Sequence, residues 1–105
     1  MKIYFIYVTF GSFKEAKRLG GQLVKNKLAA CTNIIPEIYS TYVWKNKTMV
    51  DKECSMIVKT SKTKVEAAIK FIVKKHSYEC PAVSAFPIDS AHVDFKKWIY
   101  EQTKS

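Results

Sequence analysis

Two long strand-like stretches joined by a short turn constrain the fold of this chain more than any other feature. They cover residues 31–44 and 48–60, and Lys45-Asn46-Lys47 between them predicts a hairpin turn in which Asn46 tolerates the left-handed conformation. Each strand has about 13 residues, whereas strands of globular proteins most often have about 5–6. No other predicted strand is long enough to pair along the whole hairpin, so its outer part would expose aromatic side chains and unpaired edges to water. We therefore expect a homo-oligomer in which each hairpin completes the sheet of a neighbouring copy.

The segments around the hairpin predict two shorter strands and three helices. Residues 2–9 are apolar on both faces and predict a central strand that is covered on both sides. Residues 82–88 predict a short strand with Pro87 at a sheet edge, and Pro36 predicts an edge or a bulge in the first hairpin strand. The helix starts are predicted by hydroxyl side chains, which can accept hydrogen bonds from the free amides of a first turn. These residues are Ser12, Thr63 and Ser90.

The resulting order, β-α-β-β-α-β-α, predicts a single α+β domain over residues 1–105. Its first six elements match the ferredoxin-like split β-α-β arrangement, an antiparallel sheet with helices on one face, here with a long central hairpin and an extra C-terminal helix. The first helix contains Gly20-Gly21, and we expect another backbone to pack closely against this pair. No apolar run approaches the roughly 20 residues of a membrane span, so we expect a cytoplasmic protein without a membrane partner.

The charge of the chain is strongly positive, with 18 basic and 9 acidic residues and a formal charge of +9. Such a charge could serve nucleic-acid binding through phosphate neutralisation. Arg18 is the only arginine, however, and base and phosphate recognition favour the planar guanidinium over the lysine ammonium. The lysines are also spread along the chain without a block of like charges. We interpret the charge as a solvated lysine surface and predict no nucleic-acid partner.

The residues of common catalytic sites do not occur in recognisable patterns. With three glycines the chain has no glycine-rich phosphate loop, and neither His76 nor His92 lies in a Ser-His-Asp or Cys-His motif. The three cysteines form no C-x-x-C pair, and an odd number cannot all pair within one chain. Cys54, in an apolar strand, is best interpreted as a small buried side chain. We predict a protein with reduced cysteines that is not an enzyme.

Three motifs go beyond these patterns. K-L-A-A-C-T-N at residues 27–33 leads into the hairpin, S-T-Y-V-W at 40–44 lies within it, and H-S-Y-E-C-P at 76–81 follows the second helix. In this order and spacing they resemble the CutA family of divalent-cation tolerance proteins over essentially the whole chain. The resemblance implies a ferredoxin-like subunit similar to the nitrogen-regulatory PII proteins. It also implies a tight homotrimer made by hairpin and sheet contacts, and a link to copper and other divalent metals.

Candidate copper ligands are also implied by the resemblance. In some family members the ligands are a cysteine of the first strand and two adjacent histidines after the second helix, and these positions here hold Val8, Lys75 and His76. Because Lys75 would repel a cation, a copper site would have to be rebuilt from His76 with Cys31, Glu79 or a neighbouring subunit. His76 can instead cap a helix end or lie in an interface, and Cys31 can be buried packing.

A second candidate site follows from the similarity to PII trimers, which have clefts between their subunits. Glu53 and Lys59 are charged side chains in a long strand, and they either face solvent or meet across subunits in such a cleft. The candidates for this small-ligand or anion site are Glu53, Lys59, Tyr78, Trp44 and Glu79. Two hypotheses result: a metal-tolerance trimer that binds copper or another divalent cation, and a PII-like trimer that binds a small ligand or a protein.

Overall fold

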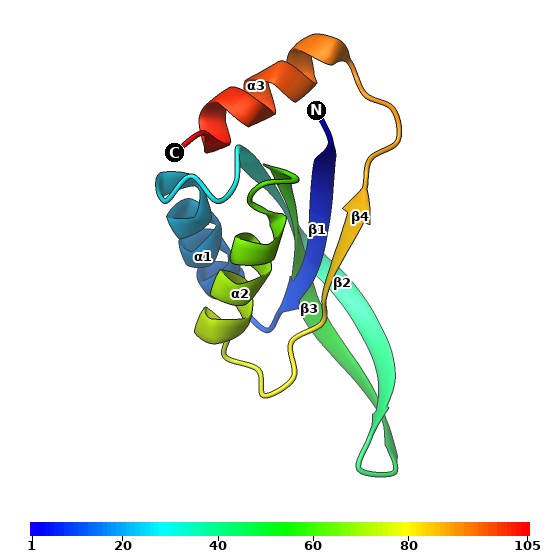
Figure 1. Ribbon diagram of the computed structural model, residues 1–105. Helices are drawn as coiled ribbons and strands as arrows, with labels where there is room; N and C mark the ends of the chain where they lie inside the picture. Colours follow the sequence, from blue (N-terminus) through cyan, green and yellow to red (C-terminus); the bar gives the residue numbers. More distant parts are fainter.

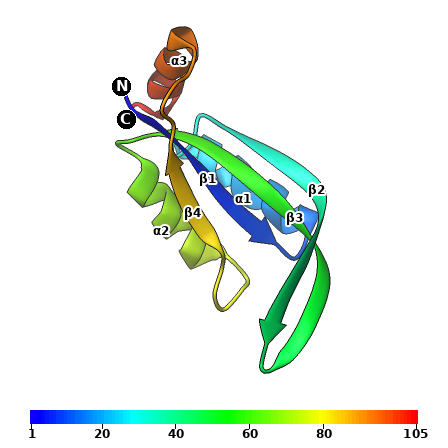
Figure 2. The same ribbon diagram turned by 90° about the vertical axis from the view of Figure 1, so that its right-hand side faces the viewer.

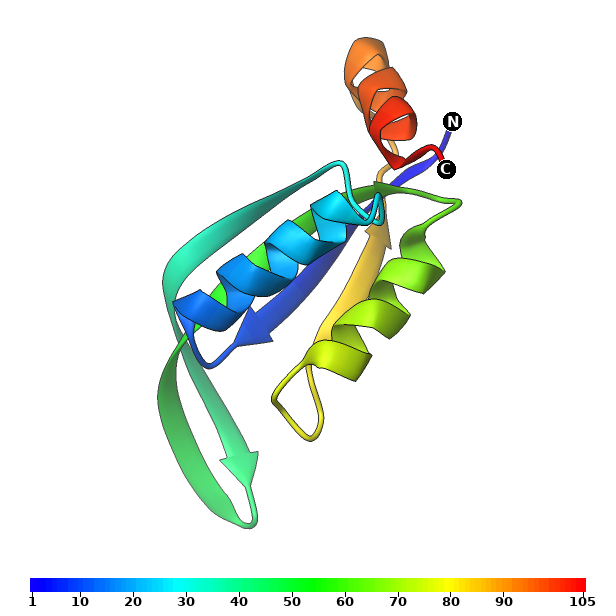
Figure 3. The ribbon, with the colours of Figure 1, turned by 90° about the vertical axis from the view of Figure 1, so that its left-hand side faces the viewer.

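Strands and helices alternate in the predicted order in the computed structural model of this chain, which describes residues 1–105. The strands form one antiparallel sheet in the order β2-β3-β1-β4, as the α+β, ferredoxin-like prediction requires. Helices α1 and α2 lie side by side on one face of this sheet (Figure 3), and α3 crosses its far end (Figure 1). The elements are β1 (Ile3–Phe10), α1 (Phe13–Lys25), β2 (Cys31–Trp44), β3 (Lys47–Ser61), α2 (Val65–Lys75), β4 (Val83–Pro87) and α3 (Val93–Thr103).

The hairpin of β2 and β3 extends well beyond the rest of the sheet, as predicted (Figure 1). Strand β1 pairs only with residues 54–61 of β3, so residues 47–53 have β2 as their sole neighbour. This overhang contributes to a longest dimension of 45 Å for a chain of only 105 residues. At its tip Lys45 and Asn46 have φ values of 51° and 66°. Both central residues are therefore left-handed, as a two-residue hairpin turn requires, although the sequence indicated this only for Asn46.

Both prolines of the strands lie where the sequence predicted them. The pairing of β2 with β3 shifts register between Ile35 and Ile38, so Pro36 lies in an irregularity of an edge strand. Pro87 ends β4, the other edge of the sheet. Neither proline interrupts a ladder between two central strands, which explains why the sheet tolerates them.

The hydrophobic core lies between the sheet and helices α1 and α2. Its largest fully buried members include Phe10, Leu19, Met56 and Ile72, and Cys54 is buried among them as predicted. Each such aliphatic or aromatic side chain stabilises the fold by roughly 1.5–3 kcal/mol relative to an exposed position. Three further strand residues, Ile6, Val8 and Val58, belong to the same core of 13 buried residues.

The glycine pair of α1 behaves differently from the prediction. A Cβ on Gly20 would lie 3.0 Å from Met56 Sδ and 3.0 Å from Thr32 Oγ1, whereas a Cβ on Gly21 would meet nothing within 4 Å. The close neighbours of Gly20 are thus side chains of the sheet rather than another backbone. Gly20 allows α1 to approach the sheet, and Gly21 faces open space.

The opposite face of the sheet is only partly covered (Figure 2). On β1 the residues of this face, Phe5, Tyr7 and Thr9, are half-buried. Helix α3 covers the end near Phe5, where Ile3 and Ile99 form a small second core. The prediction that β1 is covered on both sides therefore holds for only one face within a single chain, because α1 and α2 both lie on the same side.

Two of the three predicted helix caps are wrong. Ser12 does cap α1, since its Oγ accepts a hydrogen bond from the Glu15 amide at 3.1 Å. Thr63 does not cap α2, because its hydroxyl is bonded to Ser61 Oγ at 2.9 Å and Lys64 occupies the cap position. Ser90 lies before the start of α3, whose cap position is His92 without a side-chain bond. None of the helices has the length and apolar character that a membrane span requires.

Candidate functional site

A groove of about 550 Å³ opens beside the overhanging hairpin. Its walls come from three separate parts of the chain: the last residues of β1, the outer part of the hairpin, and the segment between α2 and β4. The lining residues are Thr9, Ser40, Tyr42, Trp44, Glu53, Tyr78, Glu79, Cys80 and Ala82. A volume of this size lies within the range of ligand pockets, which is roughly 300–1,000 Å³.

The structure brings most of the predicted cleft residues together in this groove. Glu53, Tyr78 and Trp44 line it, and Glu79, a candidate for both sites, lies beside them. Lys59 does not. Its ammonium lies 5.3 Å from the ring centroid of Phe5 and 5.7 Å from that of Phe95, under helix α3 at the other end of the sheet. Within one chain, the groove therefore lacks the Lys59 cation of the anion-site interpretation, and the predicted meeting of Glu53 and Lys59 across subunits stays a prediction.

Tyr78 connects two walls of the groove. Its hydroxyl donates a hydrogen bond of 2.5 Å to Glu53 Oε2 and so joins the segment after α2 to the hairpin. Burial, followed by this hydrogen bond, raises the pKa of Tyr78 well above the ordinary tyrosine value, so the phenol remains neutral. A Cβ on Gly11 would lie 3.2 Å from Tyr78 Oη and 3.3 Å from its Cε1. Gly11, which the sequence indicated only as an interruption, makes room for this ring.

A second tyrosine–carboxylate pair lies on the hairpin wall. Tyr42 donates its hydroxyl hydrogen to Asp51 Oδ2, and this bond is the main cause that raises the pKa of Tyr42. The Lys45 ammonium lies over the ring of Trp44, 5.9 Å from its centroid. Tyr42 was not among the residues predicted for this site. The available signal was its position two residues before Trp44, because side chains two positions apart in a strand lie on the same face.

His76 is a structural residue within this single chain. Its side chain is fully buried, and its ring stacks on Phe10 with centroids 4.6 Å apart and an interplanar angle of 8°. Nδ1 accepts a hydrogen bond of 3.0 Å from the Tyr78 amide, which assigns the proton to Nε2, and Nε2 donates to the Thr9 carbonyl at 2.7 Å. Both ring nitrogens are thus already bonded. His76 ends α2 and orients the segment that carries Tyr78.

Glu15 holds the same segment from the other side. Its carboxylate accepts hydrogen bonds of 2.8 Å from both the amide and the hydroxyl of Ser77. A glutamate three residues after a serine cap often directs its carboxylate back to the cap residue, but here the carboxylate binds Ser77 instead. The start of α1 and the end of α2 are therefore joined by charge-assisted bonds at Ser77, the residue before Tyr78.

The candidate metal ligands do not meet in the single chain. Cys31 begins β2 opposite Lys59, which pairs with Phe5 near the start of β1, whereas His76 contacts Thr9 near its end. Phe5 and Thr9 are four positions apart along the strand, which corresponds to roughly 13 Å. Burial raises the pKa of the Cys31 thiol, and only the charge of Lys59 opposes this. No three side chains of His, Cys, Asp or Glu cluster so that they could hold a metal ion.

Val8 and Lys75, which stand at the positions of copper ligands in some family members, have structural surroundings of their own. Val8 is fully buried in the core and faces no cavity. Lys75 extends over the ring of Phe71, with its ammonium 5.7 Å from the centroid. The residues of this chain therefore do not fit a copper centre within one subunit.

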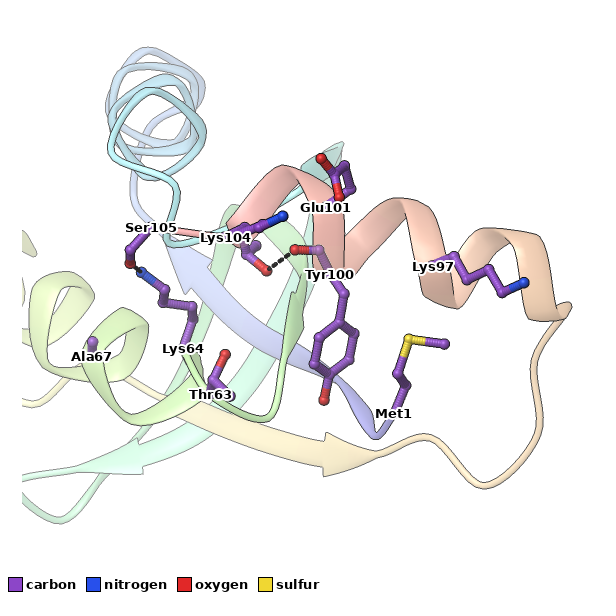
Figure 4. A pocket seen from close by; sticks show the side chains of 10 residues that line it. Met1, Thr63, Lys64, Ala67, Lys97, Tyr100, Glu101, Lys104 and Ser105 are labelled. Atoms are coloured by element: carbon purple, nitrogen blue, oxygen red, sulfur yellow. Dashed lines mark hydrogen bonds between the residues drawn. The ribbon is translucent and has the colours of Figure 1, made fainter.

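A larger hollow of about 900 Å³ lies at the other end of the molecule, between α3 and the start of α2 (Figure 4). Three lysines are among the residues that line it: Lys64, Lys97 and Lys104. Lys64 donates to Ser105 Oγ at 2.6 Å, and Tyr100 donates its hydroxyl hydrogen to the Lys2 carbonyl at 2.7 Å. None of the predicted site residues lines this hollow. The groove beside the hairpin is the stronger candidate site.

The positive charge of the chain is concentrated away from the groove. Residues 12–27 and 62–75, which form α1, α2 and their flanks, hold ten of the 18 basic residues but only two acidic ones, Glu15 and Glu66. No lysine or arginine lines the groove. The sequence suggested an even distribution of lysines, but the fold gathers the largest share on the helical layer.

Comparison with known proteins places this architecture in one family. Residues 4–102 match the family model described as CutA1 divalent ion tolerance protein. The chain belongs to the CutA1 family. It is 40% identical over 97 residues to the divalent-cation tolerance protein CutA of Archaeoglobus fulgidus, a match that covers 92% of this chain and 94% of the relative. It superimposes on the crystal structure of the CutA1 protein from Ehrlichia chaffeensis with a TM-score of 0.96 and 34% identity, covering 100% of this chain and 99% of the other.

Other CutA relatives are longer than this chain. The chloroplastic CutA 1 protein of rice is 35% identical over 99 residues, a match that covers 94% of this chain but only 56% of the relative. The chain thus spans about half the length of several curated CutA proteins that it matches. The ferredoxin-like prediction and the family resemblance are both confirmed by these matches.

Proposed function

We propose that this CutA1 chain assembles as a cytoplasmic homotrimer that takes part in divalent-cation tolerance and catalyses no reaction. The observation that carries the proposal is the match with the archaeal divalent-cation tolerance protein, which covers nearly the full length of both chains. In this proposal a divalent cation is a ligand of the assembly rather than a resident cofactor.

The trimer is supported by the overhanging hairpin. Tyr39, Val43 and Val50 on its outer part are 68%, 68% and 64% exposed, which is unusual for apolar side chains gathered on one hairpin. The free edge of β2 offers unpaired backbone groups to a neighbouring strand. A closed ring of copies would cover both features, because each copy presents the same hairpin and receives that of its neighbour.

A non-enzymatic role is supported by the state of the two histidines. His76 has both ring nitrogens engaged, and His92 lies at the surface beside Asp94, far from the groove. Many hydrolytic sites depend on a histidine that acts as a general base next to a nucleophile, and neither histidine is placed in this way.

Direct copper binding through His76, Cys31 and Glu79 is not supported within one chain, because Cys31 lies away from His76 and no three such side chains cluster. If the trimer binds copper or another divalent cation, the ligands must come from more than one subunit. The groove favours the second hypothesis, a PII-like trimer that binds a small ligand, because aromatic and acidic side chains converge there.

The proposed function is tested in a bacterium from which its own CutA gene has been deleted. Growth is measured in rising concentrations of copper, zinc and cobalt, with this chain, with its Val43→Asp variant, or with an empty vector. We expect the wild-type chain to restore growth and the variant to restore it less. Equal growth of the wild-type and empty-vector strains at every metal concentration would contradict the proposed role. Fractionation of the same cells tests the cytoplasmic location.

A further inference from the structure

We propose that the groove beside the hairpin binds a small organic ammonium ion. This inference rests on the proposed ligand-binding role of the assembly and names the chemistry of its ligand. It is carried by the composition of the groove wall, in which carboxylates and aromatic rings occur together without a basic side chain.

The charge of the groove is opposite to that of the chain. Glu53 and Glu79 line it, and no lysine, arginine or histidine does, although the whole chain has a formal charge of +9. The one basic residue that the sequence assigned to this cleft, Lys59, lies over Phe5 and Phe95 instead. Apart from the Lys45 ammonium, which lies over the Trp44 ring, an anion entering the groove would have no cation within one chain to pair with, whereas a cation would find two carboxylates.

The aromatic residues favour an organic cation. Tyr42, Trp44 and Tyr78 line the groove, and the face of an aromatic ring attracts an ammonium group placed within about 6 Å of its centroid. Lys45 makes such a cation–π contact with Trp44, since its ammonium lies 5.9 Å from the ring centroid. The two tyrosines direct their hydroxyl hydrogens to Asp51 and Glu53, so they remain neutral.

A bare divalent ion fits this wall less well than an organic ammonium ion. Calcium takes six to eight oxygen ligands, and zinc takes about four close nitrogen, oxygen or sulfur ligands. No cluster of three such side chains exists in the chain, and one oxygen of Glu53 already accepts from Tyr78. An alkyl ammonium needs only one or two carboxylates for its charge, and its apolar stem can lie against Trp44 and Ala82.

The test compares putrescine with butane-1,4-diol, which has the same carbon chain and hydroxyl groups in place of the ammonium groups. Binding to the intact protein is measured by titration calorimetry and by the fluorescence of Trp44 in a Trp98→Phe background. We expect saturable binding of putrescine at millimolar or lower concentration and binding of the diol at least about tenfold weaker, since charged hydrogen bonds and cation–π contacts would be lost. Tetramethylammonium should compete with putrescine.

Variants test the residues of the groove. Glu79→Gln, in an exposed segment, should weaken putrescine binding by roughly three- to tenfold without affecting folding, and Glu53→Gln should do at least as much. Glu37→Gln is the matched control, because Glu37 is a hairpin carboxylate outside the groove. The inference would be overturned by equal binding of putrescine and the diol, or by no saturable binding of putrescine. An equal loss of binding in Glu37→Gln, or tighter binding of inorganic phosphate than of putrescine, would overturn it as well. If any of these occurs while the chain still restores metal tolerance, only the ammonium assignment fails.

Discussion

Tyr78 and Glu53 are joined by a hydrogen bond of 2.5 Å between segments 25 positions apart in sequence. One partner follows α2 and the other belongs to the overhanging part of β3, so this bond connects the body of the domain to the hairpin. The bond also defines one wall of the groove, and Gly11 provides the space that the tyrosine ring needs.

Removing the hydroxyl in Tyr78→Phe should destabilise the fold. The bond has a carboxylate acceptor but lies in a half-buried site, so we expect a loss of about 1 kcal/mol in the free energy of unfolding. Urea denaturation followed by circular dichroism measures the loss. Tyr39→Phe is the control, because Tyr39 bonds to a carboxylate at the exposed hairpin surface. Equal losses in the two variants would contradict a specific role for the Tyr78–Glu53 bond.

The same bond makes a prediction for alkaline pH. Because the pKa of Tyr78 is raised in the folded chain, the native state holds this proton more tightly than the unfolded state. The resulting stability is complete below the ordinary tyrosine pKa of about 10 and is lost as the pH rises above it toward the folded value. The stability of the wild-type chain should therefore fall more steeply above about pH 10 than that of Tyr78→Phe. Parallel curves of unfolding free energy against pH for the two proteins would contradict a contribution of the raised Tyr78 pKa to stability.

The sequence could predict the architecture because each element carries its own periodic pattern. The alternation in residues 31–44 and 48–60 required a long hairpin, and Pro36 indicated the irregularity in it. The caps of α2 and α3 could not be predicted in this way, because Thr63 has a competing partner in Ser61 and Ser90 lies outside the helix. A hydroxyl before a helix shows that a cap is available, not that it is used.

The candidate site was predictable only in part, for a related reason. Trp44 and Tyr78 come from motifs whose spacing resembles a known family, and the fold brings them together with Glu53, a charged residue of the long hairpin. Lys59 comes from the same strand as Glu53, but register pairs it with Phe5, close to α3. Strand pairing and the path of the hairpin decide which residues of the 15-residue strand β3 reach the groove. Neither can be predicted from the local sequence.

The two adjacent glycines of α1 should respond oppositely to alanine. Gly21→Ala places its methyl group in open space within a helix, so we expect about 1 kcal/mol of stabilisation. Gly20→Ala would bring a Cβ to 3.0 Å from Met56 Sδ and from Thr32 Oγ1, and the crowding should cancel or exceed that gain. Thermal unfolding of the two variants measures the difference. A higher melting temperature for Gly20→Ala than for Gly21→Ala would contradict the close approach of α1 to the sheet.

His76→Ala should lower stability without changing copper affinity. The substitution removes the stack on Phe10 and the two ring hydrogen bonds, which together should cost roughly 2–4 kcal/mol. His76→Phe keeps an aromatic ring against Phe10 and serves as a second, better folded variant. Competitive copper titration is carried out under conditions in which circular dichroism shows each protein to be folded, with His92→Ala as the control. Weaker copper binding in both folded His76 variants, but not in the control, would restore His76 as a ligand.

The hairpin surface provides the test of assembly. Val43→Asp places a charge on an apolar side chain of the overhang that is 68% exposed in the single chain, and burial of that charge between copies would be unfavourable. Multi-angle light scattering should give the wild-type chain three times its subunit mass of 12.1 kDa and should give Val43→Asp a lower mass. Val73→Asp is the matched control, since Val73 is 48% exposed on α2, away from the hairpin. A monomeric mass for the wild type, or dissociation in Val73→Asp but not in Val43→Asp, would show that the hairpin does not hold the copies together.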